Sequence, residues 1–507
     1  MTDANSLSGL PYYQLYINGE WSDASNEAAF VTIEPATGEP LARLAEASAS
    51  DVDRAVKAAR QAFDHGPWPH TPANERVKIL HAIADALEQQ TDVLAELEAR
   101  DSGATLRKTT FIDIPLGIEH LRTIAELARR HPYEPLPWVD MPSVSWNFVW
   151  REPIGVCAQI TPWNFPFLAL MWKIGPALAT GNCVVLKPSP LAPLSTMAVT
   201  KIIDELQLLP KGVLNIVNGD AETGEALVAH PGVDKVAFTG SCEVGRKVMA
   251  SAAQTLKRVS LELGGKSPSI VLPNADFDLA VDGVLFGAFL HAGQYCESGT
   301  RCFVPRQQHD AFVERLVGRI SGVTLGDPLD LTTDIGPLIS EKQRERVESY
   351  IRLGLEEGAT LACGGRRPAN PELRGPYIEP TIFCNVANKS RLAQEEIFGP
   401  VLAVIPYDDV TQAIEMANDS VYGLGGAVWS RDLQEAIEVA KRIRTGTVWI
   451  NDHHLINAVA PFGGYKQSGI GRELGLAGLN EYTQEKHIHV DLMQKRDGRI
   501  WWDTLLP

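Results

Sequence analysis

One of the seven cysteines lies in a setting suited to chemistry. Cys296 stands in GQYCESGTRCFVP, between a Gly-Gln pair and a Ser-Gly-Thr turn that precedes an apolar run. A thiol in such a loop can be reached and deprotonated, and its thiolate is a nucleophile. An ordinary loop cysteine is the alternative. The other six lie mostly in apolar segments, as small core residues do: Cys157, Cys183, Cys242, Cys302, Cys363 and Cys384.

Three polar side chains stand at the ends of apolar runs that resemble strands. Glu262 ends VSLE, and a carboxylate at the end of a buried strand is either paired or functional. Asn164 lies in ITPWNFP, where two prolines would hold its amide rigidly, although most such asparagines only close a turn. Lys187 ends CVVLK, where a lysine commonly marks the exit of the strand into water. Each alone is a weak signal of function.

A glycine turn offers a place for phosphate. In FTGSCEVG, Gly240 and Ser241 open a predicted helix, and helix N-termini bind anions such as a pyrophosphate. Gly-Ser also caps many helices that bind nothing. Two standard nucleotide motifs fail: GGKS has Ser260 where a phosphate loop needs Gly, and GLGGAVW has Val428 where the third glycine of G-x-G-x-x-G belongs.

Strand and helix patterns alternate regularly around these residues. Between Ile154 and Leu263, short apolar runs alternate with helix-like segments of ten or more residues, which predicts βαβ units and a parallel sheet. A second alternating region follows, with PSIVL, TRCFVP, VLAVIPY and TVWIN as predicted strands. Open parallel sheets bind ligands beyond the carboxyl ends of their strands, so function is expected there. Two successive α/β domains are predicted.

The flanking segments have simpler patterns. Ser50 is predicted to cap one helix, and a longer helix is predicted from about Asn74 to Arg100. Apolar side chains alternate over residues 144–150 and again over 488–492, as in strands with one apolar face. Neither strand has a neighbour in sequence, so each must pair with a distant strand or with another subunit, and both possibilities stay open.

The composition is that of an ordinary globular protein. Its 507 residues, 45% hydrophobic and 21% charged, predict two to four domains. A net charge of −17 without a long basic run argues against nucleic acid as a partner. No stretch approaches about 18 uninterrupted apolar residues, which argues against a membrane, and the N-terminus does not resemble a signal peptide. Seven cysteines without disulfide spacing fit a reducing compartment, so a cytoplasmic protein is predicted.

Taken in order, several motifs resemble one known family. YINGEW, PWNFP, LKPS, FTGS, LELGGKS, GQYC, EEIFGPV and PFGGYKQSG are similar to the NAD(P)-dependent aldehyde dehydrogenase superfamily over nearly the whole chain. The resemblance implies an α/β fold of two Rossmann-type parallel-sheet domains and a small β oligomerisation arm. It implies a cofactor-binding domain at 1–130 and 151–263, a catalytic domain at 264–467, and an arm and C-terminal tail at 131–150 and 484–507. A homodimer or a dimer-of-dimers tetramer is implied.

The resemblance also implies an acid-forming reaction. Cys296 would attack an aldehyde to give a hemithioacetal, whose oxyanion is held by the amide of Asn164 and the backbone N–H of Cys296. Hydride would pass to the nicotinamide, and Glu262 would activate the water that hydrolyses the remaining thioester. Lys173 and Glu473 match positions that relay the proton of Glu262 to solvent. A buried ion pair is the structural alternative and is compatible with that relay.

Binding residues follow from the same resemblance. NAD is the implied cofactor, and the residues implied to hold it are Ile160, Trp163, Lys187, Gly240, Ser241, Leu263, Glu396 and Phe398. The implied substrate funnel is mostly apolar, which favours an aliphatic or aromatic aldehyde: it comprises Phe165, Ala169, Trp172, Tyr295, Ile456 and Phe462. No metal is implied, and the histidine pairs 453–454 and 487/489 are predicted to lie at the surface or at an interface.

Two positions depart from the family pattern. Pro190 stands where many NAD-preferring members carry a glutamate that binds the ribose hydroxyls and repels a 2′-phosphate, so NADP is predicted as a second cofactor. Glu297 follows the nucleophile, where the family often has a small neutral residue. A carboxylate facing the thiol would raise the pKa of Cys296. Successive side chains of a strand point apart, so Glu297 is predicted to face away.

The C-terminal tail and two rival functions complete the expectations. Trp501, Trp502, Leu505 and Leu506 are predicted to pack on a neighbouring subunit, since they would be costly to leave in water. From the residues alone, a cysteine hydrolase or acyltransferase without a redox step remains an alternative. A non-catalytic protein on the same fold is the other.

Overall fold

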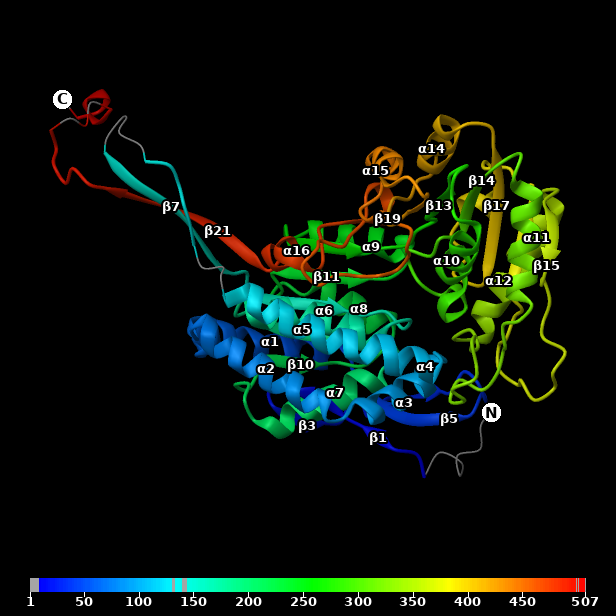
Figure 1. Cartoon of the computed structure of the whole chain (residues 1–507). Helices are drawn as coiled ribbons and strands as arrows, with labels where there is room; N and C mark the ends of the chain where they lie inside the picture. The colour runs from blue at the N-terminus through cyan, green and yellow to red at the C-terminus, as the bar shows by residue number, and fades with distance from the viewer. Residues whose placement is uncertain (1–8, 130–132, 139–143, 498, 500, 507) are drawn as a thin grey trace.

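An eight-stranded sheet organises the first half of the molecule (Figure 1). The structure is a computed structural model and describes residues 9–129, 133–138, 144–497, 499 and 501–506. Five consecutive strands of the sheet are parallel, which confirms the predicted fold class: β8 (Val156–Ile160), β9 (Cys183–Lys187), β10 (Leu214–Ile216), β11 (Lys235–Thr239) and β12 (Arg258–Glu262). Antiparallel β2 (Leu15–Ile17), β3 (Glu20–Ser22) and β20 (Gly469–Ile470) extend its edges.

The strand order creates a crevice at one edge of this sheet. The parallel strands run β12-β11-β8-β9-β10, so the chain leaves β8 toward one side and later returns to its other side as β11. Ligands bind open α/β sheets at such a switch point, outside the carboxyl ends of the strands. Here those ends are Ile160 and Thr239, which lie in paired strands.

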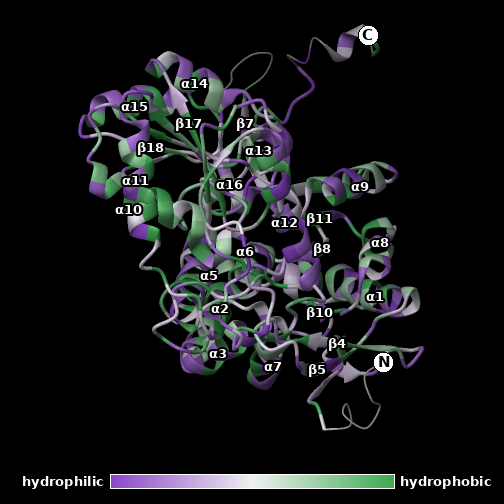
Figure 2. Ribbon diagram, turned by 90° about the vertical axis from the view of Figure 1, so that its right-hand side faces the viewer, coloured by the Kyte–Doolittle hydropathy of each residue, from purple (hydrophilic) through white to green (hydrophobic). Residues whose placement is uncertain are grey.

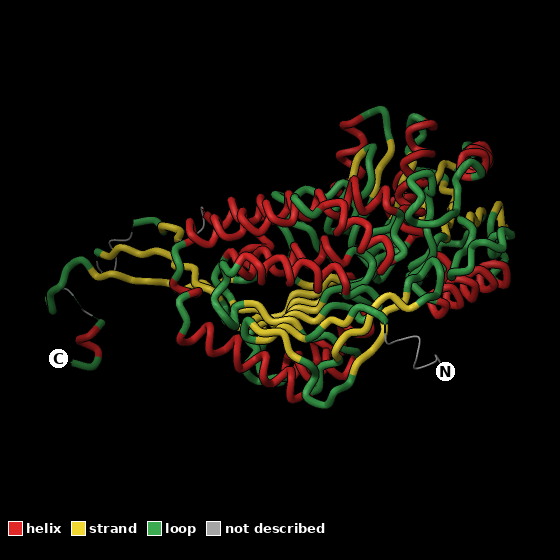
Figure 3. The backbone as a smooth tube through the Cα atoms, turned by 90° about the horizontal axis from the view of Figure 1, so that it is seen from below, coloured by secondary structure: helices red, strands yellow, loops and turns green. Residues whose placement is uncertain are grey.

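Helices surround the sheet in two groups (Figure 3). One group packs together along strands β8 to β12: α1 (Ala49–His65), α8 (Ala221–Ala229) and α9 (Cys242–Ala253). The other comprises α2 (Ala73–Glu88), α3 (Thr91–Ser102), α5 (Ile114–Arg129), α6 (Pro166–Ala179), α7 (Leu194–Leu206) and α16 (Gly475–Asn480). Short turns join these helices: η1 (Trp68–His70), α4 (Leu106–Lys108) and the π-helical η2 (Thr109–Asp113).

Two predictions about these helices were wrong in detail. The cap of α1 is Ser48 rather than Ser50, because Asp51 stands three residues after Ser48 and completes a reciprocal capping box with it. The helix predicted from Asn74 to Arg100 is two helices, α2 and α3. The Thr91 hydroxyl donates to the carbonyl of Glu88 at 2.8 Å and so satisfies the end of α2.

A seven-stranded sheet organises the second half. Its strands run in the order β15 (Thr360–Cys363), β16 (Thr381–Cys384), β17 (Val401–Tyr407), β14 (Arg301–Pro305), β13 (Pro268–Val271), β18 (Ala427–Trp429) and β19 (Trp449–Ile450). All pairs are parallel except β15 with β16. The accompanying helices are α10 (Phe277–Phe289), α11 (His309–Ile320), α12 (Glu341–Glu356), α13 (Arg391–Gln394), α14 (Val410–Asn418) and α15 (Leu433–Arg442). Most carry both apolar and polar residues (Figure 2), as expected of helices that cover a sheet.

Buried side chains in the described residues form two clusters that follow the two sheets. One reaches from Leu15 to Tyr482 and the other from Ile270 to Ile443. Cys296 packs against the first cluster, although its neighbours Phe289 and Ala292 belong to the second. Cys296 therefore lies where the two cores approach each other. No helix of the described residues is long and apolar enough to cross a membrane.

A long antiparallel ribbon projects from the body (Figure 1). β7 (Ser145–Pro153) pairs with β21 (Thr483–Asp491) along its whole length, and β6 (Tyr133–Pro135) pairs with β7. The two strands predicted to lack sequence neighbours are thus each other's partner within one chain. Trp146 and Trp150 remain exposed. Residues 131, 132 and 139–143 of the predicted arm lie outside the described residues, as do residue 130 before it and residues 498, 500 and 507 of the tail.

Two small elements complete the fold. β1 (Tyr12–Tyr13), β5 (Pro40–Ala45) and β4 (Ala29–Ile33) form a three-stranded sheet near the N-terminus. The turn η5 (Trp502–Thr504) lies near the C-terminus, where Leu505 and Leu506 are exposed on this chain.

Candidate active site

A cavity of about 1490 Å³ opens at the carboxyl ends of β8, β9, β11 and β12. It exceeds the roughly 300–1,000 Å³ of a typical small-molecule site, so it can take a ligand the size of a dinucleotide. Cys296, Glu262 and Asn164 are on its wall, and the predicted cofactor residues join them: Ile160, Trp163, Lys187, Gly240, Ser241, Leu263, Glu396 and Phe398. Motifs spread over more than 200 residues thus meet in one space.

Cys296, the predicted nucleophile, lies on an irregular loop between α10 and β14. Just before it, the turn η3 (Leu290–Gly293) holds His291 and Ala292 at φ 50° and 53°, left-handed conformations that cost about 1–3 kcal/mol each for such residues. Gly265 passes so close that a Cβ there would lie 2.4 Å from the carbonyl oxygen of Cys296. Surrounding structure rather than regular secondary structure therefore fixes Cys296 at the cavity.

The amide of Asn164 is bonded to the loop that carries Cys296. The buried Asn164, between β8 and α6, donates from Nδ2 to the backbone oxygen of Gln294 at 2.9 Å. Gln294 is itself fixed, because its Oε1 accepts from the backbone N–H of Ile339 at 2.9 Å. An amide nitrogen has two N–H groups, so Asn164 retains one for a ligand. This geometry suits the stabilisation of an oxyanion formed at Cys296.

Glu262 is a buried carboxyl with a free oxygen. It ends β12 on the cavity wall, and its Oε2 has no hydrogen bond partner within the described residues. Gly463, at φ 156°, passes its other oxygen so closely that a Cβ would lie 2.8 Å from Oε1. Burial raises the pKa of Glu262 well above its usual value, and the charge of Glu473 raises it further. A carboxylate with a raised pKa is a stronger base toward water.

Lys173 and Glu473 form a buried ion pair whose charges act on Glu262. Lys173 Nζ donates to Glu473 Oε1 at 2.5 Å and to the hydroxyl of Thr239 at 2.8 Å. The two charged side chains are 1% and 7% exposed. Lys173 lowers the pKa of Glu262, against the larger effects of burial and Glu473. The ion pair is present, and its part in a proton relay stays a prediction.

One set of residues on the cavity wall suits a ribose and a pyrophosphate. Lys187 ends β9 and is buried, which lowers the pKa of its ammonium to about 8 against the opposing charges of Asp220 and Glu46. Its Nζ donates to the carbonyl of Pro188 at 3.1 Å. Ser241 is the N-cap of α9, a helix of 12 residues whose first N–H groups face an anion favourably.

A second set of residues on the wall presents a carboxylate and two aromatic rings. Glu396 accepts from the backbone N–H of Gly265 at 3.0 Å, and burial raises its pKa to about 7. Phe398 meets Trp163 edge to face, with ring centroids 5.3 Å apart. Two cavity residues on α12 that the sequence did not reveal hold this segment. Gln343 donates to the carbonyl of Phe398 at 2.8 Å and Arg346 donates to that of Glu396 at 2.6 Å.

The residues predicted for the substrate funnel lie outside this cavity. The described residues that line the cavity include none of the six, all of which are buried: Phe165, Ala169, Trp172, Tyr295, Ile456 and Phe462. Tyr295 precedes Cys296 and Phe165 follows Asn164, so both lie next to the proposed reacting groups. Trp172 packs on Phe462 with ring centroids 5.4 Å apart.

Two predictions about polar residues were wrong. His453 and His454 are buried rather than at the surface, while His487 and His489 are exposed on β21 as predicted. Glu297 faces the thiol of Cys296, which donates to its Oε2 at 3.0 Å. The strand rule failed because residues 295–298 form a turn, in which the N–H of Ser298 donates to the carbonyl of Tyr295. Burial raises the pKa of Cys296 well above its usual value, and Glu297 adds to this.

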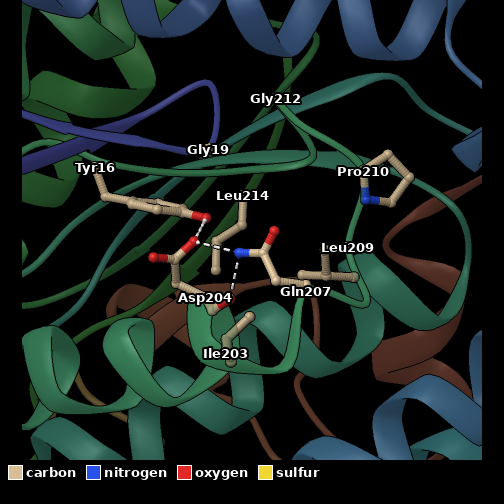
Figure 4. Close-up of a pocket in the computed structure, with 9 residues that line it drawn as sticks. All are labelled: Tyr16, Gly19, Ile203, Asp204, Gln207, Leu209, Pro210, Gly212 and Leu214. Atoms are coloured by element: carbon tan, nitrogen blue, oxygen red, sulfur yellow. Dashed lines mark hydrogen bonds between the residues drawn. The ribbon is translucent and has the colours of Figure 1, made fainter.

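A much smaller hollow lies elsewhere in the described chain. A hollow of about 20 Å³ between β2 and α7 has room for about one water (Figure 4). Its polar groups bond to one another: the hydroxyl of Tyr16 donates to Asp204 at 2.8 Å, and Gln207 Nε2 donates to the carbonyl of Asp204 at 2.6 Å. Among the described residues, no group of three or more His, Cys, Asp or Glu side chains could hold a metal ion.

Known proteins resemble this chain in sequence and in fold. The model of the Aldehyde dehydrogenase family matches residues 21–488. A betaine aldehyde dehydrogenase of Bacillus subtilis is 46% identical over 480 residues, covering 94% of this chain and 96% of the relative. The mitochondrial aldehyde dehydrogenase of Homo sapiens is 43% identical over 485 residues, covering 95% and 92%. A crystal structure of betaine aldehyde dehydrogenase from Staphylococcus aureus in complex with NAD+ matches with a TM-score of 0.93 at 41% identity, covering 97% and 98%.

Proposed function

The chain belongs to the aldehyde dehydrogenase family, and from that membership we propose that Cys296, Asn164 and Glu262 oxidise an aldehyde to its carboxylic acid, with NAD as hydride acceptor. One observation carries the assignment of residues. The nucleophile, the amide donor and the buried base share a cavity with eight residues suited to a dinucleotide. A cysteine hydrolase or a non-catalytic protein would not need these eight dinucleotide-binding residues.

The first half of the reaction takes place on Cys296. Its sulfur attacks the aldehyde carbon, and the oxyanion that forms is held by the remaining N–H of Asn164 and the backbone N–H of Cys296. One such donor is worth about 10²–10³ in rate. The tetrahedral adduct is a far better hydride donor than the free aldehyde, which is why covalent capture precedes oxidation. NAD, when bound, would supply the hydride acceptor, and loss of that hydride from the adduct would leave a thioester on Cys296.

The second half requires water and a base. Glu262 takes a proton from the water that attacks the thioester, which releases the carboxylic acid and the thiolate. The unpartnered Oε2 of Glu262 supports this role, because it is free to bond that water. The carboxylate of Glu473 then accepts the proton from Glu262 on its way to solvent, while Lys173 stays its ammonium partner, a part supported by the charges of both residues acting on Glu262.

The cofactor is held along the cavity wall. Lys187 binds the adenosine ribose, Ser241 and Trp163 contact the pyrophosphate, and Glu396 and Phe398 orient the nicotinamide ribose and ring. Ile160, Gly240 and Leu263 complete the wall. The NAD+ complex of the Staphylococcus aureus relative supports this assignment. Pro190 also lines the cavity and carries no charge to repel a 2′-phosphate, so NADP is a second cofactor.

The substrate is an apolar aliphatic or aromatic aldehyde. The buried, mostly apolar side chains around Phe165, Trp172 and Phe462 support this class. None of the six predicted substrate-binding residues is an arginine, the side chain that would bind a substrate carboxylate.

The assembly is a homodimer or a dimer-of-dimers tetramer. The exposed Trp146 and Trp150 on the projecting ribbon support contact with a second subunit. Residues 1–130 and 151–263 form the cofactor domain and 264–467 the catalytic domain, a division supported by the two sheets. The seven cysteines, all described, are unpaired, which supports a reducing, cytoplasmic location.

A panel of aldehydes tests the proposal. NADH absorbance is followed with wild type and Cys296→Ala, and ester hydrolysis is measured alongside. We expect NADH formation with apolar aldehydes that is lost in the variant. Ester hydrolysis without NADH formation would support the hydrolase, and inactivity in both assays would support a non-catalytic protein.

A further inference from the structure

A chain of hydrogen bonds runs from the nucleophile into the protein. The thiol of Cys296 donates to Oε2 of Glu297 at 3.0 Å. The other carboxylate oxygen, Oε1, accepts from Nδ1 of His454, which is 157 residues further along the chain. The side chains of Glu297 and His454 are only 2% and 6% exposed. The Glu297 carboxylate therefore bridges the nucleophile and an imidazole inside the protein.

This arrangement is costly to maintain. Removing a charge from water costs several kcal/mol per ion, and a neutral side chain of similar volume would avoid that cost. His454 also adopts a left-handed backbone conformation at φ 67°, which costs about 1–3 kcal/mol. Its second ring nitrogen, Nε2, is buried without a partner in the described part of the chain. A pair kept at such cost beside a nucleophile points to a use in the reaction.

We propose that Glu297 is the base that takes the thiol proton when Cys296 attacks the aldehyde, and that His454 is a positioning residue. His454 keeps the Glu297 carboxylate ionised and aimed at the sulfur. The inference rests on the proposed function, because it assigns one proton transfer within that reaction. Glu262 then serves water alone, so each carboxylate serves one half of the reaction.

Atoms and charges balance in this step. The S–H bond of Cys296 breaks as the C–S bond forms, and its proton moves to Oε2 of Glu297. The π electrons of the carbonyl become the oxyanion that Asn164 holds. Glu297 begins as a carboxylate and ends as a neutral acid, so the net charge of the site is unchanged. After hydrolysis of the thioester, Cys296 leaves as a thiolate and recovers the proton from Glu297.

The pKa values of Cys296 and Glu297 determine at which point of the reaction the proton moves. Burial alone would raise the pKa of Glu297, but the charge and hydrogen bond of His454, with the bond from Cys296, hold that pKa below its usual value. Burial and the charge of Glu297 raise the pKa of the thiol. The proton therefore stays on sulfur at rest. As the C–S bond forms, sulfur becomes far more acidic than the carboxyl, and the proton moves.

Several elements present titratable groups to this pair. The charge of Glu297 acts on Tyr295 of its own loop, on Glu262 of β12, and on His453. The charge of Asp452 raises the pKa of His453. Asp113 of η2 accepts a hydrogen bond from Lys108, and the charge of His454 lowers the pKa of Asp113. Burial raises the pKa of Glu297, and the charge of His454 is the largest of the effects that lower it.

Glu297→Gln tests the proposal, because glutamine keeps the shape of the side chain and removes its charge. Two rates are measured: alkylation of Cys296 by iodoacetamide without cofactor, and the NADH burst of the first turnover with NAD and an aldehyde. We expect alkylation at pH 7 to rise about tenfold or more as the neighbouring charge disappears. The burst should slow about 10²-fold or more as the base is lost. Glu314→Gln, at an exposed position on α11, should change neither rate.

Movement of the two rates in opposite directions separates a base from a merely structural carboxylate. A burst that accelerates together with alkylation, or two unchanged rates, would overturn the proposal. Absence of any NADH formation by wild type would reject the proposed function itself, whereas normal first-turnover NADH formation by wild type with unmoved variants rejects only the role of Glu297.

A second variant tests the positioning role and does not depend on the folding of the first. His454→Gln removes the charge that holds the pKa of Glu297 down, so that pKa should rise. Because the base must be ionised, the acid limb of the pH profile of the burst should move to higher pH. His453→Gln, which alters a bond to the backbone carbonyl of Glu297 rather than to its carboxylate, should leave the limb in place. An unmoved limb in His454→Gln would overturn the assignment of His454.

Discussion

Lys173 and Glu473 carry opposite charges that both act on Glu262, so replacing each should move the pH dependence of thioester hydrolysis in opposite directions. Glu473→Gln removes a charge that raises the pKa of Glu262, and Lys173→Met removes one that lowers it. Hydrolysis needs Glu262 as a carboxylate. Its acid limb should therefore move to lower pH in Glu473→Gln and to higher pH in Lys173→Met.

The same two variants should lose stability by an amount that follows from their burial. The two side chains are almost fully buried and 2.5 Å apart. Removing one partner leaves an unpaired buried charge, which costs about 3–5 kcal/mol of unfolding free energy. The double variant leaves neither charge and should recover part of that loss. Urea unfolding of the three variants measures both effects.

Hydrolysis is assayed directly on the acyl-enzyme. Limiting aldehyde is mixed with enzyme and excess NAD at each pH, and the acyl group on Cys296 is followed by mass spectrometry after quenching. Glu314→Gln serves as the control with an unchanged profile. Limbs that move in the same direction in both variants, or in neither, would refute the view that these two charges set the acidity of Glu262.

Four further changes test other parts of the site and the assembly. Cys296→Ala should abolish aldehyde-dependent NADH formation but leave NAD binding, measured by calorimetry, intact. Loss of NAD binding as well would contradict a purely chemical role of Cys296. Asn164→Ala should lower kcat about 10²–10³-fold with an almost unchanged Tm, and an unchanged kcat would remove it from the oxyanion site. Pro190→Glu should lower kcat/KM for NADP more than for NAD, whereas wild type without NADP turnover would contradict a second cofactor. Deleting residues 496–507 should lower the mass of the assembly or its Tm, and no change in either would argue against packing of the tail on a neighbour.

The sequence was sufficient to predict the positions of those candidate site residues that lie at the ends of strands. Glu262, Lys187 and the turn at Gly240-Ser241 follow runs of buried residues, so their positions depend on the order of parallel strands. The Ile160 and Thr239 strand ends meet because β8 and β11 are neighbours in that order. Apolar periodicity specifies such elements strongly, and the switch point then brings their ends together.

The contacts around Glu297 could not be predicted in the same way. Its direction depends on a turn whose conformation is imposed by packing, including the left-handed His291 and Ala292. His454 reaches it from a loop 157 residues away, and nothing in local periodicity joins two loops. Gln343 and Arg346 were missed for a related reason, because they lie on a mostly polar helix whose pattern indicates only exposure.

The most direct test of the central claim asks whether the substrate becomes an acyl group on Cys296 through oxidation. Glu262→Gln should retain the first half-reaction and lose the base for the second, so the thioester should accumulate. After exposure to an aldehyde and NAD, the peptide that contains Cys296 should gain the mass of the acyl group, with one NADH formed per acyl group. No gain should occur without NAD. An acyl group on another residue, or on Cys296 without NADH formation, would contradict the claim.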